Sequence, residues 1–173
     1  MKRFINQFSL TVILTILLTN LTQGQVSENS ELFKTLKSKD SLLFERSFNK
    51  CETKWLQTLV DEDFEFYHDQ SGITNSKGAF INIMNNGICN PNNETKSRRV
   101  LVPGSLKVYP LMNNGKLYGA IQMGTHRFFE RYKTQPETAG SIAQFSHLWI
   151  LKENTWYVKR VLSYDHKMPK KHN

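Results

Sequence analysis

The stretch that decides the fold is the last long hairpin of the sequence, residues 141–166. It reads Ser-Ile-Ala-Gln-Phe-Ser-His-Leu-Trp-Ile-Leu over 141–151, Lys-Glu-Asn-Thr over 152–155, and Trp-Tyr-Val-Lys-Arg-Val-Leu-Ser-Tyr-Asp-His over 156–166. Two runs rich in aromatic and β-branched residues on either side of a short polar turn are typical of a β-hairpin. Because side chains alternate between the faces of a strand, one face of this hairpin is expected to be strongly apolar.

A turn at Glu153-Asn154 sets the predicted register of this hairpin. The register pairs Leu151 with Trp156, Trp149 with Val158, His147 with Arg160, Phe145 with Leu162, and Ala143 with Tyr164. His147 and Arg160 are then neighbours on an apolar, concave face. Burial and an adjacent cation both disfavour a protonated imidazole, so we expect His147 to be neutral near pH 7.

The predicted pair of His147 and Arg160 has two interpretations. A neutral imidazole beside a guanidinium suits the binding of a carboxylate or another anionic oxygen, and it also permits general-base catalysis. Alternatively the pair is structural, with Arg160 reaching Asp165, Glu130 or a backbone carbonyl.

The N-terminus has the pattern of a secretory signal peptide over residues 1–24. Lys2 and Arg3 precede an apolar run from Phe8 to Leu18, and Thr22-Gln23-Gly24 offers small residues for cleavage. The run is shorter than the roughly 20 residues of a membrane span, although an uncleaved anchor is an alternative. We therefore expect an exported protein, periplasmic or secreted, without membrane association after cleavage. A polar segment, 25–30, follows.

The positive charge of the chain is dispersed. The net charge is +8 over all 173 residues and falls to +6 without Lys2 and Arg3. Its densest groups are residues 96–99, interpreted as a solvated edge strand, and the basic tail 167–173, expected to be disordered. Without a nucleic-acid-binding motif or a basic face with interleaved aromatic residues, we expect no nucleic-acid partner.

Two cysteines, Cys51 and Cys89, leave two alternatives open. In an exported protein an even number of cysteines favours a disulfide, but two buried free thiols fit the sequence equally well.

The order of the expected elements indicates an α+β fold. Apolar residues at helical spacing predict helices near 32–36 and over 43–59, the second capped by Asp40 or Ser41. A short strand over 64–68 and a helix over 77–86 follow, with Gly87 expected as a left-handed C-terminal cap. The remainder reads as strands over 98–102, 106–112 and 117–131, then the last hairpin. Helices followed by a meander predict helices packed on one face of an antiparallel sheet.

Four stretches of the chain resemble a known family. They are Asp63-Phe-Glu-Phe-Tyr-His-Asp69, Gly124-Thr-His-Arg127, Phe145-Ser-His-Leu-Trp149 and Arg160-Val-Leu-Ser-Tyr-Asp-His166. They are similar to an exported, largely uncharacterised group of the nuclear transport factor 2-like superfamily, in its SnoaL-like branch. The resemblance implies a cone-shaped domain over 31–166, with N-terminal helices on a strongly bent antiparallel sheet, a pocket at the open end, and a homodimer formed through the sheet. Members include isomerases, dehydratases, cyclases, epoxide hydrolases and binding domains, so the resemblance assigns no catalytic residue.

Other histidines are candidates for the pocket. His68 alternates with Phe64 and Phe66 and is expected to face inward, while Asp69 begins a turn. His166 lies two residues after Tyr164 and would share its face of the strand, but it lies at the end of that strand. The face occupied by His126 is open: pairing across Asn114-Gly115 puts Leu106, Val108, Ile121 and Met123 on the apolar face and His126 on the other, unless a bulge at Gly124 reverses this. The histidines lack a short metal-ligand spacing and no Gly-x-Ser-x-Gly elbow occurs, so we expect no metal, no cofactor and no serine triad.

Three hypotheses of function follow. The first is a non-catalytic domain that binds a small, partly apolar ligand with an anionic or carbonyl group, through the side chains His147, Arg160, Tyr164 and His68 and the walls Trp149 and Phe145. The second is a lyase, isomerase or hydrolase with His147 or His68 as base, oriented by Asp69 or Asp165. The third is a structural or partner-binding module with a filled pocket. Less than about 300 Å³ of concave space would count against the first two.

Overall fold

The first helix of the structure is continuous where two helices were expected. The structure, a computed structural model, describes residues 24–169. Helix α2 (Glu31–Ser41) begins where the Ser30 side chain accepts a hydrogen bond from the Phe33 amide, and it passes directly into the π-helix η1 (Leu42–Asn49). The predicted cap at Asp40 or Ser41 is therefore wrong, because the apolar stripe runs through both segments. The predicted signal peptide lies outside the described residues except for Gly24.

Short elements connect this helix to the sheet. They are the 3-10 turn η2 (Thr53–Trp55), α3 (Leu56–Leu59), β1 (Val60–His68), β2 (Gly72–Thr74), α4 (Lys77–Ile83) and the π-helix η3 (Met84–Ile88). Ser76 caps α4 through a hydrogen bond from the Ala79 amide. Gly87 lies inside η3 and is not among the glycines with positive φ, so the predicted left-handed cap is wrong. None of the described helices is long and apolar enough to cross a membrane.

The remaining strands complete one seven-stranded sheet. They are β3 (Thr95–Leu101), β4 (Lys107–Asn113), β5 (Lys116–Tyr132), β6 (Thr138–Lys152) and β7 (Thr155–Lys167). The strand order is β2-β1-β7-β6-β5-β3, with β4 also paired to β5. Strand β1 runs parallel to β7, so the sheet is mixed where a wholly antiparallel sheet was predicted. The chain returns to β1 only after the whole meander, and this parallel pairing places His68 beside Ser163.

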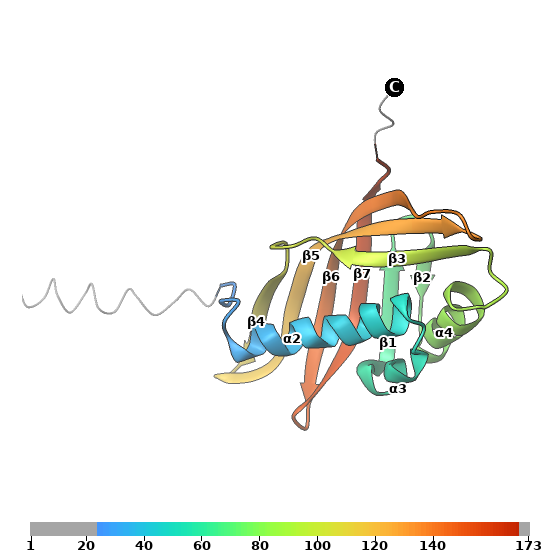
Figure 1. Ribbon diagram of the computed structural model, residues 1–173. Helices are drawn as coiled ribbons and strands as arrows, with labels where there is room; N and C mark the ends of the chain where they lie inside the picture. Colours follow the sequence, from blue (N-terminus) through green and yellow to red (C-terminus); the bar gives the residue numbers. More distant parts are fainter. Residues whose placement is uncertain (1–23, 170–173) are drawn as a thin grey trace, which may run out of the picture.

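The long strands bend across the helical layer. Figure 1 shows β3 and the far ends of β5 and β6 turning over the top of the sheet, while α2 and α3 cover one face. The register between β5 and β6 shifts between Arg127 and Phe129, close to this turn. A bulge inserts an extra residue and increases local twist, so it allows one sheet to curve around its own core. The structure thus confirms the α+β class and the layer of N-terminal helices.

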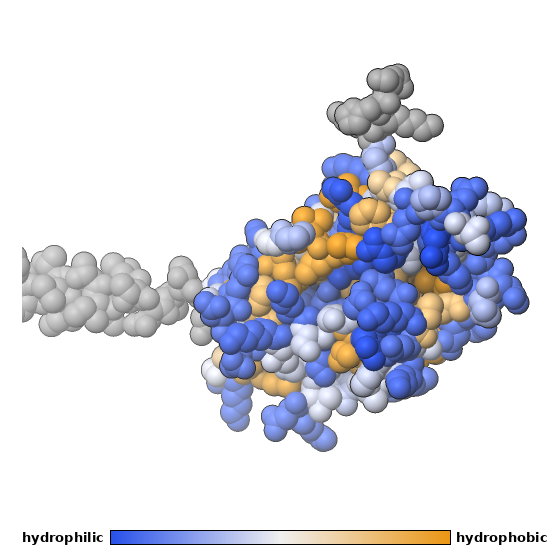
Figure 2. Space-filling view, in the orientation of Figure 1, coloured by the Kyte–Doolittle hydropathy of each residue, from blue (hydrophilic) through white to orange (hydrophobic). Residues whose placement is uncertain are grey.

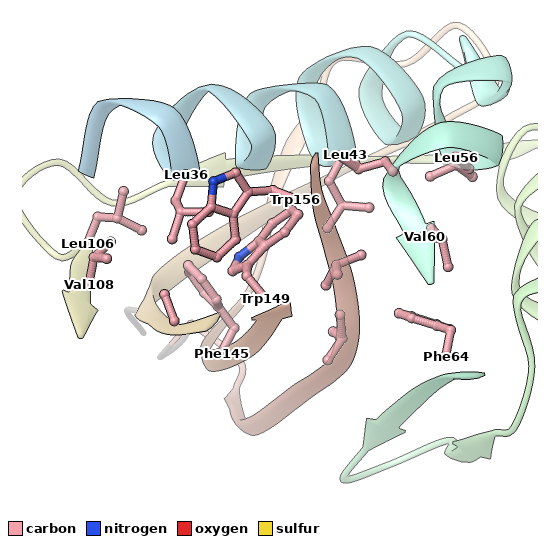
Figure 3. Packing of buried hydrophobic residues seen from close by; sticks show 14 of the residues in the cluster. Leu36, Leu43, Leu56, Val60, Phe64, Leu106, Val108, Phe145, Trp149 and Trp156 are labelled. Carbon is pink, nitrogen blue, oxygen red and sulfur yellow. The ribbon is translucent and has the colours of Figure 1, made fainter. Parts of the chain in front are cut away.

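The core lies between the long helix and the sheet. Figure 3 shows Phe145, Trp149 and Trp156 between α2 and the strands, and Leu36 and Trp149 are completely buried. Burying a side chain of this size contributes about 1.5–3 kcal/mol relative to leaving it exposed. On the outer surface, apolar side chains show between the long helix and β3 on a face that is otherwise mostly hydrophilic (Figure 2).

Bulges also decide which residues of the two hairpins face inward. Leu151 pairs with Trp156 and Trp149 with Val158, as predicted, around a turn in which Glu153 and Asn154 both have positive φ. Beyond Val158 the register shifts, because Lys159 is an extra residue.

In the preceding hairpin the turn Asn114-Gly115 is also as predicted, but the register shifts between Leu111 and Met112. Val108 therefore pairs with Gln122, and Gln122 and His126 are buried while Ile121 and Met123 are only half-buried. The expected inward placement of Ile121 and Met123 is wrong, and His126 faces the interior.

Candidate functional site

A cavity of about 360 Å³ lies between η1, α4 and the bent sheet. Its walls are mainly aliphatic and aromatic, and four histidines interrupt them: His68, His126, His147 and His166. Serine and glutamate side chains, Ser71, Ser97, Glu130, Ser141 and Ser163, supply further polar groups. The volume exceeds the roughly 300 Å³ at which small-molecule pockets begin, so it disfavours the hypothesis of a filled pocket.

The predicted contact residues divide between the cavity and other places. His68, His147 and Phe145 line the cavity, as expected. Trp149 is fully buried in the core beside it, where its indole N–H donates to Gln122 Oε1 at 2.9 Å. Tyr164 pairs with Gln144 and lies 3.5 Å, hydroxyl to hydroxyl, from Ser146, so it is not a cavity residue in the described structure.

The predicted pair of His147 and Arg160 does not form. Because Lys159 bulges out of β7, Arg160 pairs with Leu148 and points to the face opposite His147. Arg160 Nε lies 2.7 Å from Glu65 Oε2, and the guanidinium also donates to the backbone carbonyl of Asp63. Neither interpretation of the pair therefore holds, and only the contact of Arg160 with a backbone carbonyl was expected.

The hydrogen bonds of Gln122 fix the tautomer of His147. An indole N–H can only donate, so the Gln122 atom that faces Trp149 is the amide oxygen. The same oxygen lies 3.1 Å from His147 Nδ1, and the Gln122 amide nitrogen donates to Leu36 O at 3.0 Å. His147 Nδ1 must therefore carry the proton, and Nε2 holds an unshared electron pair.

The Nε2 atom of His147 is buried and has no hydrogen-bond partner within residues 24–169. Burial, and then the charge of Arg99 and the neighbouring His126, hold the pKa of His147 well below its usual value. The predicted neutral state of His147 is confirmed, although the nearby cation is Arg99 and not Arg160. His147 lines the cavity, so the wall of the cavity holds one buried acceptor without a partner, and an unpaired buried acceptor costs about 1–3 kcal/mol.

A buried ion pair supports the other side of the cavity. Both nitrogens at the end of the Arg99 guanidinium contact Asp40, at 2.7 and 3.2 Å, and both side chains are almost fully buried. Burial raises the pKa of the Asp40 carboxyl, and the Arg99 charge opposes that shift. Asn49 holds the backbone of Arg99 through a pair of hydrogen bonds, which ties η1 to β3.

Arg99 also sets the direction of a chain of hydrogen bonds. Its Nε–H donates to His126 Nδ1 at 3.3 Å, so a neutral His126 carries its proton on Nε2. Burial, followed by the charge of Arg99, lowers the pKa of His126 to about 3, which makes the neutral form the relevant one. His126 Nε2 then donates to Ser163 Oγ at 3.3 Å.

The chain continues from Ser163 to a carboxylate. Ser163 Oγ lies 3.3 Å from His166 Nε2, and His166 Nδ1 lies 2.6 Å from Asp69 Oδ1. Desolvation opposes ionisation of Asp69, but hydrogen bonds from the His166 backbone and ring prevail and lower the pKa of the carboxyl. With Asp69 ionised, His166 donates from Nδ1, and its Nε2 can accept the hydroxyl proton of Ser163.

His68 stacks on this group. The rings of His68 and His166 lie 4.4 Å apart, centre to centre, with 16° between their planes. Burial and the neighbouring His166 lower the pKa of His68, and its Nδ1 accepts the Gln70 amide at 3.1 Å. A neutral His68 bound in this way forms no ion pair with Asp69.

His68, Asp69 and His166 also place potential metal-ligand atoms within 4.8 Å of one another. The lone pair of an imidazole nitrogen lies in the plane of its ring, and a metal ion sits along that direction. Two nearly parallel stacked rings direct their lone pairs along separate planes, so this arrangement does not converge on one ion.

Sequence reasoning missed the residues that connect this site: Asp40, Arg99, Gln122 and Ser163. Asp40 was interpreted as a helix cap, Arg99 as part of a solvated edge strand, and Ser163 as an outward residue. In the structure Ser163 is 5% exposed while Leu162 is 41% exposed, the reverse of what apolar patterning indicates. One signal in the sequence could have pointed to these residues. The strands around them are apolar, and a polar group buried between apolar strands needs a hydrogen-bond partner.

The structural comparison identifies the architecture. A nuclear transport factor 2-like superfamily protein from Salmonella enterica matches 81% of this chain and 92% of its own, with 13% identity and a TM-score of 0.57. The chain has the nuclear transport factor 2-like fold. The predicted resemblance is thereby confirmed at the level of the fold.

Two further structures share the nuclear transport factor 2-like fold with this chain. ActVI-ORFA from Streptomyces coelicolor matches 80% of this chain and 98% of its own, with 10% identity and a TM-score of 0.61. A nuclear transport factor 2-like protein from Cytophaga hutchinsonii matches 78% and 97%, with 13% identity and a TM-score of 0.56. No protein-family model and no curated protein matches the chain. At these identities the likeness concerns the fold alone, and the function has to be argued from the cavity.

Proposed function

We propose that the protein binds a small, mainly apolar molecule that donates a hydrogen bond to His147. The observation that carries this proposal is that His147 lines a cavity of about 360 Å³ and has a buried Nε2 atom without a hydrogen-bond partner among the described residues. A hydroxyl or N–H group of a ligand would satisfy this acceptor, while aromatic and aliphatic walls bury the rest of the molecule.

The expected chemistry of the ligand changes with the position of Arg160. An anionic group needs a free cation, and Arg160 lies on the other face of the sheet with Glu65. Arg99 is the nearest cation to His147, and Asp40 already occupies it. A neutral ligand with a donor group therefore fits better than the carboxylate or carbonyl compound expected from the sequence.

A matched pair of probes tests this proposal. 2-Naphthol and 2-methylnaphthalene differ by a hydroxyl in place of a methyl group of similar size. A hydrogen bond contributes about 1 kcal/mol net, so the ratio of their dissociation constants should move by roughly fivefold to tenfold between the wild-type protein and His147→Leu. Arg160→Ala is the control and should leave the ratio unchanged. An unchanged ratio in His147→Leu would exclude His147 as the acceptor.

An enzyme is the second candidate, and one contact favours it. His166 lines the cavity with an Asp69 carboxylate 2.6 Å from its Nδ1, the arrangement of an oriented general base. This replaces His147 and His68 as the predicted bases, because their lowered pKa values make them weaker bases and neither donates a hydrogen bond to a carboxylate. Asp69 keeps its predicted orienting role. A hydrolase that uses His166 is the form of this alternative that the geometry favours.

Export and dimerisation remain parts of the proposal. Cys51 and Cys89 form a disulfide, which is typical of oxidising compartments and so supports export. Ile73, Tyr67 and Leu162 are register partners across β2, β1 and β7, and all three are exposed on the sheet. An apolar row of this kind supports a homodimer formed through the sheet. Sedimentation analysis should show a dimer for the wild-type protein and a monomer for Leu162→Lys.

A further inference from the structure

Two irregularities of β7 bring a serine and a histidine to the same wall of the cavity. The bulge at Lys159 turns Ser163 inward in place of Leu162. Two residues after Ser163, Asp165 adopts a positive φ of 60°, and the register with β6 shifts again. In a regular strand Ser163 and His166 would face opposite sides, but the second bulge puts both side chains on the inner face.

The parallel neighbour of β7 supplies the third group. His68, the last residue of β1, pairs with Ser163, so the following residue Asp69 lies beside the end of β7. The Asp69 amide donates to the Ser163 carbonyl at 3.1 Å, and its carboxylate accepts from both the backbone N–H and Nδ1 of His166. The contacts run from Ser163 Oγ to His166 Nε2 and from His166 Nδ1 to Asp69 Oδ1. This is the connectivity of a serine hydrolase triad.

From this geometry we infer that Ser163, His166 and Asp69 form a nucleophilic triad for the hydrolysis of a small, apolar ester. The inference rests on the proposed function, since the ester must enter the same cavity. Ser163 is the nucleophile, His166 is the base, and Asp69 is a positioning residue. His126 donates its Nε2–H to Ser163 Oγ, which leaves the hydroxyl proton directed at His166.

The reaction balances with water as the only co-reactant. Ser163 Oγ bonds to the ester carbonyl carbon as its proton passes to His166 Nε2, and the bond to the alcohol oxygen breaks as His166 returns that proton to the leaving alcohol. Water then attacks the acyl-serine with His166 as base. The bond from the carbonyl carbon to Ser163 Oγ breaks, the serine regains its proton, and the carboxylic acid departs.

The first test is covalent labelling with phenylmethanesulfonyl fluoride, whose aromatic group suits the cavity. The serine oxygen displaces fluoride from sulfur, and mass analysis of the peptides locates the sulfonyl group. We expect labelling of Ser163 in the wild-type protein and in Ser146→Ala, since Ser146 lies beside Tyr164 and does not line the cavity. Ser163→Ala should remain unlabelled, and His166→Gln should react at least about a hundredfold more slowly, the usual contribution of a general base.

The second test is turnover of 2-naphthyl acetate, followed by the fluorescence of released 2-naphthol. Asp69→Asn should lower kcat by about tenfold or more with KM unchanged, whereas a merely structural defect would alter KM and thermal stability as well.

The possible failures separate the two proposals. A wild-type protein that binds 2-naphthol but is not labelled at Ser163 would overturn the triad and leave the binding proposal intact. Labelling that is equally fast in His166→Gln would also overturn it. A protein that neither binds 2-naphthol nor reacts would exclude both.

Discussion

At the scale of single residues, a buried ion pair holds the polar wall of the cavity. Arg99 and Asp40 are paired, almost inaccessible to water, and joined through His126 to the cavity. A buried pair is costly to form but far more costly to break, because removing one partner leaves an uncompensated charge. The polar side chains of the cavity wall are therefore held in place by the ion pair of Arg99 and Asp40. From the sequence, both residues had been interpreted as surface residues.

Neighbouring arginines provide a matched test of this pair. Arg99→Met should lower the free energy of unfolding by about 3–5 kcal/mol, since it leaves Asp40 buried without its cation. Arg98→Met, which removes an exposed pair with Glu137, should cost less than about 1 kcal/mol. Urea unfolding of both variants at pH 7 measures the difference, and equal losses would contradict a buried charge at Arg99.

The lowered pKa values of the buried histidines predict that the protein loses stability in acid. Burial, with Arg99, His166 and His68 nearby, lowers the pKa of His126 from 6.5 to about 3. Between these values the unfolded chain binds a proton that the folded protein does not, so the free energy of unfolding falls as the pH drops through this range. His68 and His147 have lowered pKa values and act in the same direction.

Urea midpoints measured from pH 7 to pH 4 check this expectation. The wild-type protein should lose stability steadily, with each such histidine contributing up to about 1.4 kcal/mol per pH unit. His126→Gln keeps an acceptor for Arg99 and a donor for Ser163. In this variant the free energy of unfolding should fall less steeply with decreasing pH, by the equivalent of about one bound proton, or about 1.4 kcal/mol per pH unit. Stability that is independent of pH below 6.5 would show that these side chains are not desolvated.

At the scale of elements, the disulfide joins segments that frame the cavity. Cys51 follows η1, Cys89 follows η3, and the two are 38 residues apart. The double variant Cys51→Ser/Cys89→Ser should be less stable by about 3–4 kcal/mol in urea, because the unfolded chain regains the entropy of an open loop. Alkylation of the unreduced, unfolded protein checks the bond directly: two reactive thiols would show that it is absent.

The last hairpin shows how far sequence reasoning extends at this scale. Its turn and its first pairs followed from composition, because Glu153-Asn154 lies between two apolar runs. The bulges at Lys159 and Asp165 did not, since a bulge adds one residue without changing the residue types around it. One such slip reverses every later side chain, which moved Arg160 out of the cavity and Ser163 into it.

At the scale of the whole molecule, the order of helices and strands was enough to predict the α+β class. The parallel pairing of β1 with β7 was not predictable, because the choice between distant strands leaves no local pattern. That pairing nevertheless creates the site, since it brings His68 and Asp69 beside Ser163 and His166, although Asp69 and His166 are 97 residues apart in the sequence.

The proposed binding function requires that His147 present an unprotonated Nε2 atom to a ligand in the cavity. Long-range proton–nitrogen correlation spectra of the histidine rings, recorded at pH 7 with and without 2-naphthol, test it most directly. We expect a His147 ring protonated on Nδ1 only, whose Nε2 resonance moves on addition of 2-naphthol and stays in place with 2-methylnaphthalene. A His147 ring protonated on Nε2, or a resonance that 2-naphthol leaves unmoved at saturation, would contradict it.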